Sequence, residues 1–244
     1  MLHSKKSSNF AKICSKAKNM LINIVGYGKM GHVVERIAKE RGHQIGVIID
    51  LNNASDIDSD KFRSADVVIE FSTPHTAKEN IMSVWQQGLP IVSGTTGWDI
   101  EQLKFDFPQP RQSLLWSSNF SIGVNLFFEL NKRMAELIKP YKQYTASITE
   151  IHHIHKLDAP SGTAKTMAQD IAPILGYQPQ IESIREGEVP GTHTITYDSS
   201  VDTLTIRHEA KSRDGFALGA VIAAEWLVDQ PTDYYSMQDM LNIR

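Results

Sequence analysis

The residues best suited to chemistry lie in one run from 150 to 164, Glu-Ile-His-His-Ile-His-Lys-Leu-Asp-Ala-Pro-Ser-Gly-Thr-Ala. Its histidines can donate or accept a proton near neutral pH and its lysine is positively charged; these residues are His152, His153, His155 and Lys156. Ser161 can cap a following helix, and Gly162 lets a ligand approach the backbone closely. Because the first turn of a helix attracts anions and the Thr163 hydroxyl adds a donor, we predict a pocket for a carboxylated substrate that receives a proton.

Two other interpretations of this run are open. The histidines could form a solvated surface, or His152, His153 and His155 could bind a metal together with Asp158. Successive side chains of a strand point to opposite faces, so the adjacent His152 and His153 would not face the same ion. We therefore predict that the site holds no metal.

Secondary structure on both sides must position these residues. Residues 144–151 are rich in Thr and Ile with rough alternation, which predicts a half-buried strand. Residues 163–172 are helix-like, and Leu175 and Gly176 end that helix. The predicted elements that follow are a turn-rich loop at 185–191 and two strands at 192–197 and 203–208.

A second set of residues points to a dinucleotide. The run Gly26-Tyr27-Gly28-Lys29-Met30-Gly31 separates an apolar strand at 21–25 from a helical run at 32–40. In this context the first glycine allows a tight turn, the second lets the backbone approach a pyrophosphate, and the third permits close helix–strand packing. Asp50 ends the next predicted strand, 19 residues after Gly31, where an acidic residue would bind the adenosine ribose. The alternative is a glycine turn with an unrelated surface aspartate.

Asp50 also bears on the choice between the two nicotinamide cofactors. A carboxylate repels the 2′-phosphate of NADPH, which favours NADH, whereas the ammonium group of Lys29 could reach that phosphate. We predict that NADH is preferred and that NADPH can also be used.

Further ligand loops are expected where other strands of the same sheet end. Strands predicted at 66–71 and 89–93 are followed by Ser72-Thr73-Pro74 and by Gly94-Thr95-Thr96-Gly97. Ligands of open α/β sheets bind at the carboxyl ends of the strands, although the second loop by itself could be a plain turn. Residues 51–64 are polar, and we expect little regular structure there. The remaining predicted elements are helices at 72–87, 124–139 and 216–228 and a strand at 113–116.

Composition bounds the class of protein. The chain has 244 residues, 41% of them hydrophobic and 22% charged, which is ordinary for a globular protein. A net charge of −3 gives no electrostatic case for binding nucleic acid, and no apolar run is long enough for a membrane helix. Cys14 is the one cysteine, which excludes an internal disulfide framework. Residues 1–19 are rich in lysine and lack acidic residues, and we expect a disordered basic extension.

The run at 150–164 fits the pattern Glu-x-His-His-x-x-Lys-x-Asp-Ala-Pro-Ser-Gly-Thr-Ala at every fixed position. The chain therefore resembles the 4-hydroxy-tetrahydrodipicolinate reductase (dihydrodipicolinate reductase) family, over about residues 20–244. The resemblance implies an NAD(P)H-dependent oxidoreductase of lysine and diaminopimelate biosynthesis. It would convert (2S,4S)-4-hydroxy-2,3,4,5-tetrahydrodipicolinate, a small dicarboxylate, to (S)-2,3,4,5-tetrahydrodipicolinate with loss of water. It also implies a cytoplasmic homotetramer.

The resemblance also implies roles for individual residues. His152 would be the proton donor/acceptor and Lys156 the proton donor, while an arginine at the position of Arg213 lies near the substrate. The substrate carboxylates would be held by His153, Lys156, Gly162 and Thr163. The implied cofactor contacts are Gly26, Tyr27, Gly28, Lys29, Met30, Gly31, Asp50, Gly94, Thr95, Thr96, Ser117, Ser118, Asn119 and Phe120. Two departures are small: many members have arginine where this chain has Lys29, and alanine is common where it has Ser117.

The fold class implied is α/β, with a Rossmann-type parallel-sheet domain and an α+β domain with a mixed sheet. Residues 20–118 and 214–244 would bind the dinucleotide. Residues 119–213 would bind the substrate and form the oligomer contact. Two other functions share parts of the pattern: a nucleotide-sensing protein that has lost catalysis, and another small-acid dehydrogenase. The intact His152–Lys156 cluster disfavours the first, and the complete run at 150–164 disfavours the second.

Overall fold

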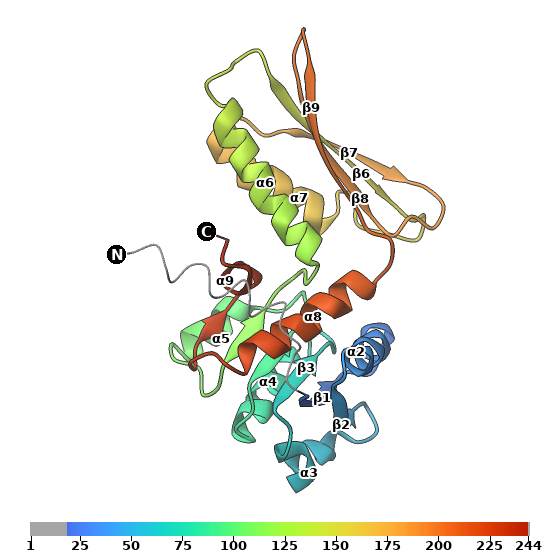
Figure 1. Ribbon diagram of the computed structural model, residues 1–244, viewed down its shortest axis with the longest axis vertical. Coiled ribbons are helices and arrows are strands. Elements are labelled where there is room, and N and C mark those ends of the chain that lie inside the picture. Colours follow the sequence, from blue (N-terminus) through green and yellow to red (C-terminus); the bar gives the residue numbers. More distant parts are fainter. Residues whose placement is uncertain (1–18, 244) are drawn as a thin grey trace. The chain divides into compact units, whose positions relative to one another are not determined.

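The computed structural model describes residues 19–243, which form two compact units (Figure 1). Of the described residues, 19–121 and 216–243 form the first unit and Ile122–Gly215 the second. The predicted boundaries at 118/119 and 213/214 lie three and two residues before these points. The predicted basic extension at 1–19 lies, apart from Asn19, outside the described residues.

The first unit is built on a parallel sheet. Strand order is β10-β5-β4-β3-β1-β2, and every neighbouring pair is parallel. Its central strands are Val- and Ile-rich and buried, as strands covered on both faces must be. The strands are β1 (Leu21–Val25), β2 (Gln44–Ile49), β3 (Val67–Glu70), β4 (Ile91–Ser93), β5 (Leu114–Trp116) and β10 (Tyr234–Tyr235). The predicted α/β class is thereby confirmed.

Helices of the first unit lie on both faces of this sheet. Helix α2 packs on β1 and β2, and α4 packs on β3 and β4. Because the two right-handed crossovers run in opposite directions along the sheet, they place α2 and α4 on opposite faces. The helical elements of the first unit, including one that starts just before its boundary, are α2 (Lys29–Glu40), η1 (Ala54–Asp58), α3 (Asp60–Arg63), α4 (Ala77–Gln86), α5 (Ile100–Asp106), α8 (Asp214–Leu227) and α9 (Met237–Leu241).

Several predictions for this unit were wrong in detail. The polar segment at 51–64 contains η1 and α3. The Ser59 hydroxyl caps α3 by accepting a hydrogen bond from Phe62 N, and the Phe62 side chain is buried. The helix expected from Ser72 begins only at Ala77, since Ser72 and Thr73 form a turn that bonds the end of β3. The elements α5, α9 and β10 were not predicted.

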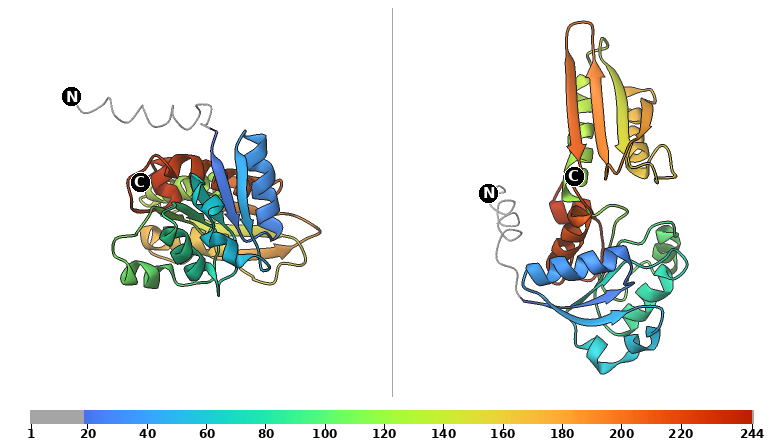
Figure 2. Two further views of the ribbon diagram at one scale, coloured as in Figure 1. Left: turned by 90° about the horizontal axis from the view of Figure 1, so that it is seen from below. Right: turned by 90° about the vertical axis from the view of Figure 1, so that its right-hand side faces the viewer.

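The second unit contains a mixed sheet, as predicted, and its helices lie on one face of that sheet. Its order is β7-β6-β8-β9, in which β6 and β7 are parallel and the other pairs antiparallel. Figures 1 and 2 show α6 and α7 side by side over one face of the sheet. The elements are α6 (Ile122–Ile138), β6 (Thr145–His152), α7 (Gly162–Leu175), β7 (Gln180–Arg185), β8 (Thr192–Asp198) and β9 (Thr203–Glu209).

Strand β7 corrects the sequence analysis. Arg185 was assigned to the start of a turn-rich loop, but it is the last residue of β7, paired in register with His152. The run 180–185 lacks clear alternation, and β7 gains its hydrogen bonds from β6, which is distant in sequence.

Helix α7 begins where its capping residue predicts. The Ser161 hydroxyl accepts a hydrogen bond from Ala164 N, so the helix starts at Gly162 rather than Thr163. Gly176, with φ of +84°, ends it in the left-handed conformation that glycine adopts readily. Among residues 19–243, none of the helices is both long and apolar enough to cross a membrane.

Candidate active site

Strand β6 brings two ionisable side chains to the covered face of the mixed sheet. Along β6, Ala146, Ile148, Glu150 and His152 are buried at alternate positions, so the period of two places Glu150 and His152 together. The four histidines of the region divide into two pairs. His152 packs edge-on against His193 of β8 with ring centroids 5.0 Å apart, whereas His153 lies 5.9 Å from His155. The adjacent His152 and His153 are thus separated into different surroundings.

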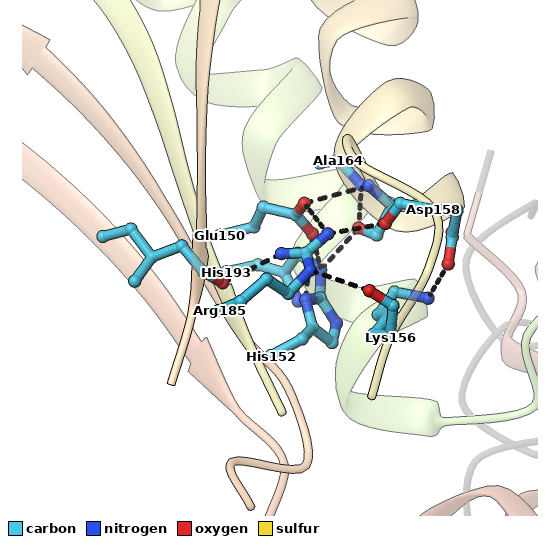
Figure 3. A network of polar contacts seen from close by, with 9 residues as sticks. Glu150, His152, Lys156, Asp158, Ala164, Arg185 and His193 are labelled. Carbon is cyan, nitrogen blue, oxygen red and sulfur yellow. Dashed lines mark hydrogen bonds and ion pairs between the residues drawn. The ribbon is translucent and has the colours of Figure 1, made fainter. Parts of the chain in front are cut away.

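Glu150 is fully buried and lies beside both histidines of the first pair, His152 and His193 (Figure 3). Its Oε1 accepts hydrogen bonds from Ser161 N at 3.0 Å and from Arg185 Nη2 at 3.1 Å. Its Oε2 lies 2.9 Å from His152 Nδ1 and 3.9 Å from His193 Nε2. Burial disfavours the charged carboxyl, but the hydrogen bonds from Ser161 and Arg185 outweigh it and lower the pKa of Glu150 to about 2. Glu150 is therefore a carboxylate.

This environment makes His152 a strong proton donor once it is protonated. Burial lowers the pKa of His152, and the positive charges of Lys156 and Arg185 lower it further. The negative charge of Glu150 acts in the opposite direction and stabilises the imidazolium. Burial and the neighbouring His152 lower the pKa of His193 to about 4, so His193 stays neutral near pH 7. His152 is thus the imidazole of the pair that can carry a proton.

Lys156 lies in the loop that joins β6 to α7. Its Nζ is 2.7 Å from Asp158 Oδ1, and this partner lowers the pKa of the aspartate. Arg185 bonds the same loop from β7: its Nε donates to Lys156 O at 3.3 Å and its Nη2 to Asp158 O at 2.5 Å. Figure 3 shows the guanidinium group between Glu150 and this loop. A substrate carboxylate that binds Lys156 must displace or join Asp158.

The start of α7 offers an anion site beside this loop. The first N–H groups of a helix, here including those of Gly162 and Thr163, have no partner within the helix. Gly162 is exposed, and a Cβ added there would meet nothing within 4 Å, which leaves room for a ligand. His153 and Thr163 are half-buried, His155 pairs with Glu188 at the surface at 3.0 Å, and Arg213 is exposed. The second unit thus gathers His152, Lys156 and a helix N-terminus in one region.

The glycine loop of the first unit has the geometry of a phosphate cradle. Gly26 has φ of +90°, and a Cβ there would lie 2.2 Å from Phe71 O, so only glycine fits. A Cβ on Gly31 would lie 2.4 Å from Gly26 O, which shows how closely the helix approaches the turn. Gly28 is exposed at the N-cap of α2, with open space where its Cβ would be. These residues fit a pyrophosphate at the first turn of α2.

Neighbouring side chains leave that cradle accessible. Lys29 is exposed and Met30 half-buried. The Tyr27 hydroxyl donates to Glu35 in a short hydrogen bond, and its ring lies 3.9 Å from that of His32. Asp50 follows β2 and is exposed, with Oδ1 accepting from Leu51 N at 2.7 Å. Its second oxygen can still bind a ribose.

The loops after β3 and β4 are tied together by a second buried glutamate, Glu70. It accepts hydrogen bonds from Ser72 N at 2.8 Å, Ser93 Oγ at 2.6 Å and Thr95 Oγ1 at 2.7 Å, and a short one from Ser72 Oγ. The Thr95 hydroxyl hydrogen is therefore used within the protein, and its carbonyl accepts from two tryptophan indoles. Thr96 is exposed and Gly94 half-buried, so both are more accessible than the buried Thr95.

The segment after β5 combines exposed and buried positions. Ser118 is exposed, while Ser117 Oγ donates to Asn119 O at 2.9 Å and accepts from Asn119 N. Phe120 is buried and packs edge-on against Phe71 at 6.0 Å. The structure thus directs the Phe120 ring into the core, and Ser118 is the exposed residue of this predicted set.

Comparison with known proteins agrees with both halves of this description. Residues 20–120 match the family model for the N-terminus of dihydrodipicolinate reductase, and residues 123–241 match the model for its C-terminus. The chain belongs to the dihydrodipicolinate reductase family. It is therefore an oxidoreductase of a family that uses NAD(P)H, and the predicted family is confirmed.

The matches to individual relatives extend over nearly the whole length of both chains. A 4-hydroxy-tetrahydrodipicolinate reductase of Christiangramia forsetii is 44% identical, over 91% of this chain and 98% of its own. One of Lawsonia intracellularis is 34% identical, with 91% and 98% covered. The solved dipicolinate-bound dihydrodipicolinate reductase of Paenisporosarcina sp. TG-14 has a TM-score of 0.73 at 23% identity and covers 93% of this chain and all of its own. That likeness supports the fold.

Three side chains of types that can bind a metal also lie close together in the site. Atoms of Glu150, His152 and His193 all lie within 4.8 Å of one another. This is a different set from the three histidines and Asp158 considered from the sequence. The Arg185 guanidinium, 3.1 Å from Glu150, already provides the positive charge that this carboxylate needs. The absence of a metal stays a prediction.

Three residues of the site were not identified from the sequence. Glu150 stood in the matched pattern but was given no role, and Arg185 and His193 were outside it. A signal existed for two of them. Glu150 is two residues before His152 on a strand, and the alternating run at 192–197 places His193 on the same face as the apolar Ile195 and Tyr197. For Arg185 no local signal was present.

Proposed function

We propose that this enzyme catalyses the NAD(P)H-dependent reduction of (2S,4S)-4-hydroxy-2,3,4,5-tetrahydrodipicolinate to (S)-2,3,4,5-tetrahydrodipicolinate in lysine and diaminopimelate biosynthesis. The observation that carries the proposal is the grouping of Glu150, His152 and Lys156 beside the N-terminus of α7. It joins proton-transfer groups to an anion site, as reduction of a dicarboxylate requires. Relatives that share 44% and 34% of their residues with this chain carry the name of that activity.

In the proposed reaction the site residues of the second unit transfer protons and hold the substrate. Loss of the 4-hydroxyl group as water would give a conjugated ring, to which a bound nicotinamide would supply a hydride. His152 acts as proton donor/acceptor, helped by the carboxylate of Glu150, which stabilises its protonated form. Lys156 acts as proton donor after exchanging Asp158 for a substrate carboxylate. The carboxylates are held by His153, Lys156, Gly162 and Thr163, which places the ring and stabilises developing negative charge.

We propose that NADH is the preferred cofactor and that NADPH can also be used. Support comes from the exposed carboxylate of Asp50 after β2, which would bind the ribose hydroxyls and repel a 2′-phosphate. The exposed ammonium of Lys29, at the first turn of α2, would offset this repulsion in part. Proposed contacts of the cofactor also include the glycine loop and the segments at 94–96 and 117–120.

We further propose a cytoplasmic homotetramer that binds neither nucleic acid nor membrane. Support for an oligomer comes from the face of the mixed sheet opposite α6 and α7. Strand register aligns hydroxyl side chains across that face: Ser147 with Thr196 and Thr205, and Thr149 with Thr194. These hydroxyl side chains and the edge strand β9 suit contact with a second copy.

The test of the activity is a coupled assay. Substrate would be generated in place from pyruvate and aspartate semialdehyde by a synthase, and oxidation of NADH and of NADPH followed by absorbance. We expect oxidation that depends on the synthase and is faster with NADH. Tight NADH binding without such oxidation would instead indicate a nucleotide sensor or a different small-acid dehydrogenase.

A further inference from the structure

Arg185 occupies a position that the catalytic scheme has not used. It is the last residue of β7, paired in parallel register with His152 on β6. Its side chain turns toward the covered face and is 19% exposed. Figure 3 shows its guanidinium group amid Glu150, Lys156 and Asp158. Sequence places it 29 residues from Lys156, so only the fold brings them together.

The guanidinium group contacts the two halves of the site at once. Toward β6, Nη2 donates to the buried Glu150 Oε1 at 3.1 Å. Toward the loop before α7, Nε donates to Lys156 O at 3.3 Å and Nη2 to Asp158 O at 2.5 Å. Nη1 donates to Ile184 O at 2.8 Å, which fixes the group against its own strand. A planar fork of five donors can make these bonds in fixed directions, which an ammonium group cannot.

The loop that carries Lys156 depends on these bonds because much of it is exposed. Leu157 is 97% exposed, and Ile154 60%. Other backbone bonds of the loop are Lys156 N to His153 O and Ile154 N to Gly187 O, both near its start. The carbonyl groups on both sides of Leu157 are the ones that Arg185 binds. The guanidinium group thus holds the backbone at Lys156 and Asp158.

We propose that Arg185 is a positioning residue that fixes the loop carrying Lys156 relative to the Glu150–His152 pair. The inference rests on the proposed function for its effect on turnover, because there His152 and Lys156 are the proton-transfer groups. Its effect on ligand binding does not need turnover, because Lys156 and the α7 N-terminus would bind a dicarboxylate in any case. Arg185 itself is not required to touch the substrate.

The experiment compares Arg185→Lys, which keeps the charge and loses the fork, with Arg133→Lys, a matched change at an exposed arginine of α6. We expect Arg185→Lys to lower kcat about 10- to 100-fold and to weaken binding of pyridine-2,6-dicarboxylate about tenfold. NADH affinity, set by the first unit, should stay within twofold. Arg133→Lys should leave kcat, dicarboxylate affinity and NADH affinity unchanged.

A second variant separates positioning from loss of folding. Arg185→Ala should be inactive or nearly so. Added methylguanidinium should raise either the kcat or the dicarboxylate affinity of this variant at least tenfold. An Arg185→Lys enzyme with kcat and dicarboxylate affinity within twofold of the parent would overturn the proposal. So would an Arg185→Ala protein that methylguanidinium does not improve. A parent that binds the dicarboxylate, loses affinity on Arg185→Lys, and yet lacks synthase-dependent oxidation would refute the proposed function alone.

Discussion

Two glutamates, one in each unit, are fully buried and are stabilised by different kinds of partner. Glu70 ends β3 and accepts hydrogen bonds from the hydroxyls of Ser72, Ser93 and Thr95 and from one backbone N–H. Glu150, in β6, accepts from a backbone N–H and from Arg185, and it lies beside two imidazoles. Burial alone therefore does not reveal what a carboxylate does.

The difference lies in whether the partners can change charge. Hydroxyl groups keep their protons near neutral pH, so the Glu70 network is a fixed frame that ties the loops after β3 and β4. The Glu150 network includes His152, whose charge can change as a proton moves, and an arginine that also bonds the Lys156 loop. We infer that the first network shapes a binding surface and the second supports proton transfer.

The largest effect should come from the proton-transfer groups themselves. His152→Gln and Lys156→Ala should each lower kcat about 10²- to 10⁴-fold, because each removes a positioned acid–base group. Affinity for NADH, measured by fluorescence titration, should change little, since the glycine loop and Asp50 belong to the first unit. An unchanged kcat in either variant would remove that residue from the mechanism.

Glu150→Gln should alter the pH dependence as well as the rate. Burial already lowers the pKa of His152, and removing the Glu150 charge, which opposes that lowering, reduces the pKa of the imidazole further. If protonated His152 is required, the basic limb of kcat/KM moves to lower pH, and activity above that limb falls about tenfold. Glu188→Gln is the matched control, since Glu188 also pairs with a histidine but at the exposed surface. A limb that moves equally in both variants, or toward higher pH, would contradict this account.

The candidate site could be predicted from the sequence only where one local run carried it. His152, Lys156 and the Ser161 cap stand within ten residues, so the pattern itself indicated their chemistry. Glu150 and His193 meet because β6 and β8 pair in the register that sets them opposite each other. Register between strands depends on contacts distant in sequence, which no local pattern contains. Arg185 was missed for the same reason, together with its strand.

The fold was predictable to a similar degree. Short apolar runs bounded by glycines and turn residues correctly placed β1, β3 and β4, because strands buried on both faces are apolar throughout. Strand β10 has two residues, too few for any periodic pattern, and forms only by pairing with β5. The helix expected from Ser72 failed because Glu70 captures Ser72 and holds it outside the helix. Tertiary contacts there overrode the local preference.

An effect of intermediate size on stability and NADH affinity is expected when Glu70 is replaced. Glu70→Gln replaces one acceptor oxygen by an NH₂ group that faces hydroxyl donors, so a buried hydrogen bond is lost. The free energy of unfolding should fall by about 1–3 kcal/mol, measured by denaturant titration. NADH affinity should weaken several-fold while kcat at saturating NADH stays within twofold, because the loops are disturbed and the acid–base groups are not. Glu79→Gln, at an exposed position of α4, should change neither quantity. A large fall in kcat at saturating NADH would contradict the inference that the Glu70 network shapes a binding surface and only the Glu150 network supports proton transfer.

The smallest effect should appear in the choice of cofactor. Asp50→Asn removes a charge from an exposed position, where a repulsion of about 1 kcal/mol corresponds to roughly a fivefold change in affinity. The ratio of kcat/KM for NADPH to that for NADH should therefore rise about fivefold, and Asp60→Asn, on α3 and also exposed, should leave it unchanged. The effect should shrink at high salt, because exposed charges are screened. A ratio that does not move would place the discrimination elsewhere in the first unit. Lys29→Ala would then be decisive, since a fall in NADPH use alone would show that the lysine, rather than the aspartate, reads the 2′-phosphate.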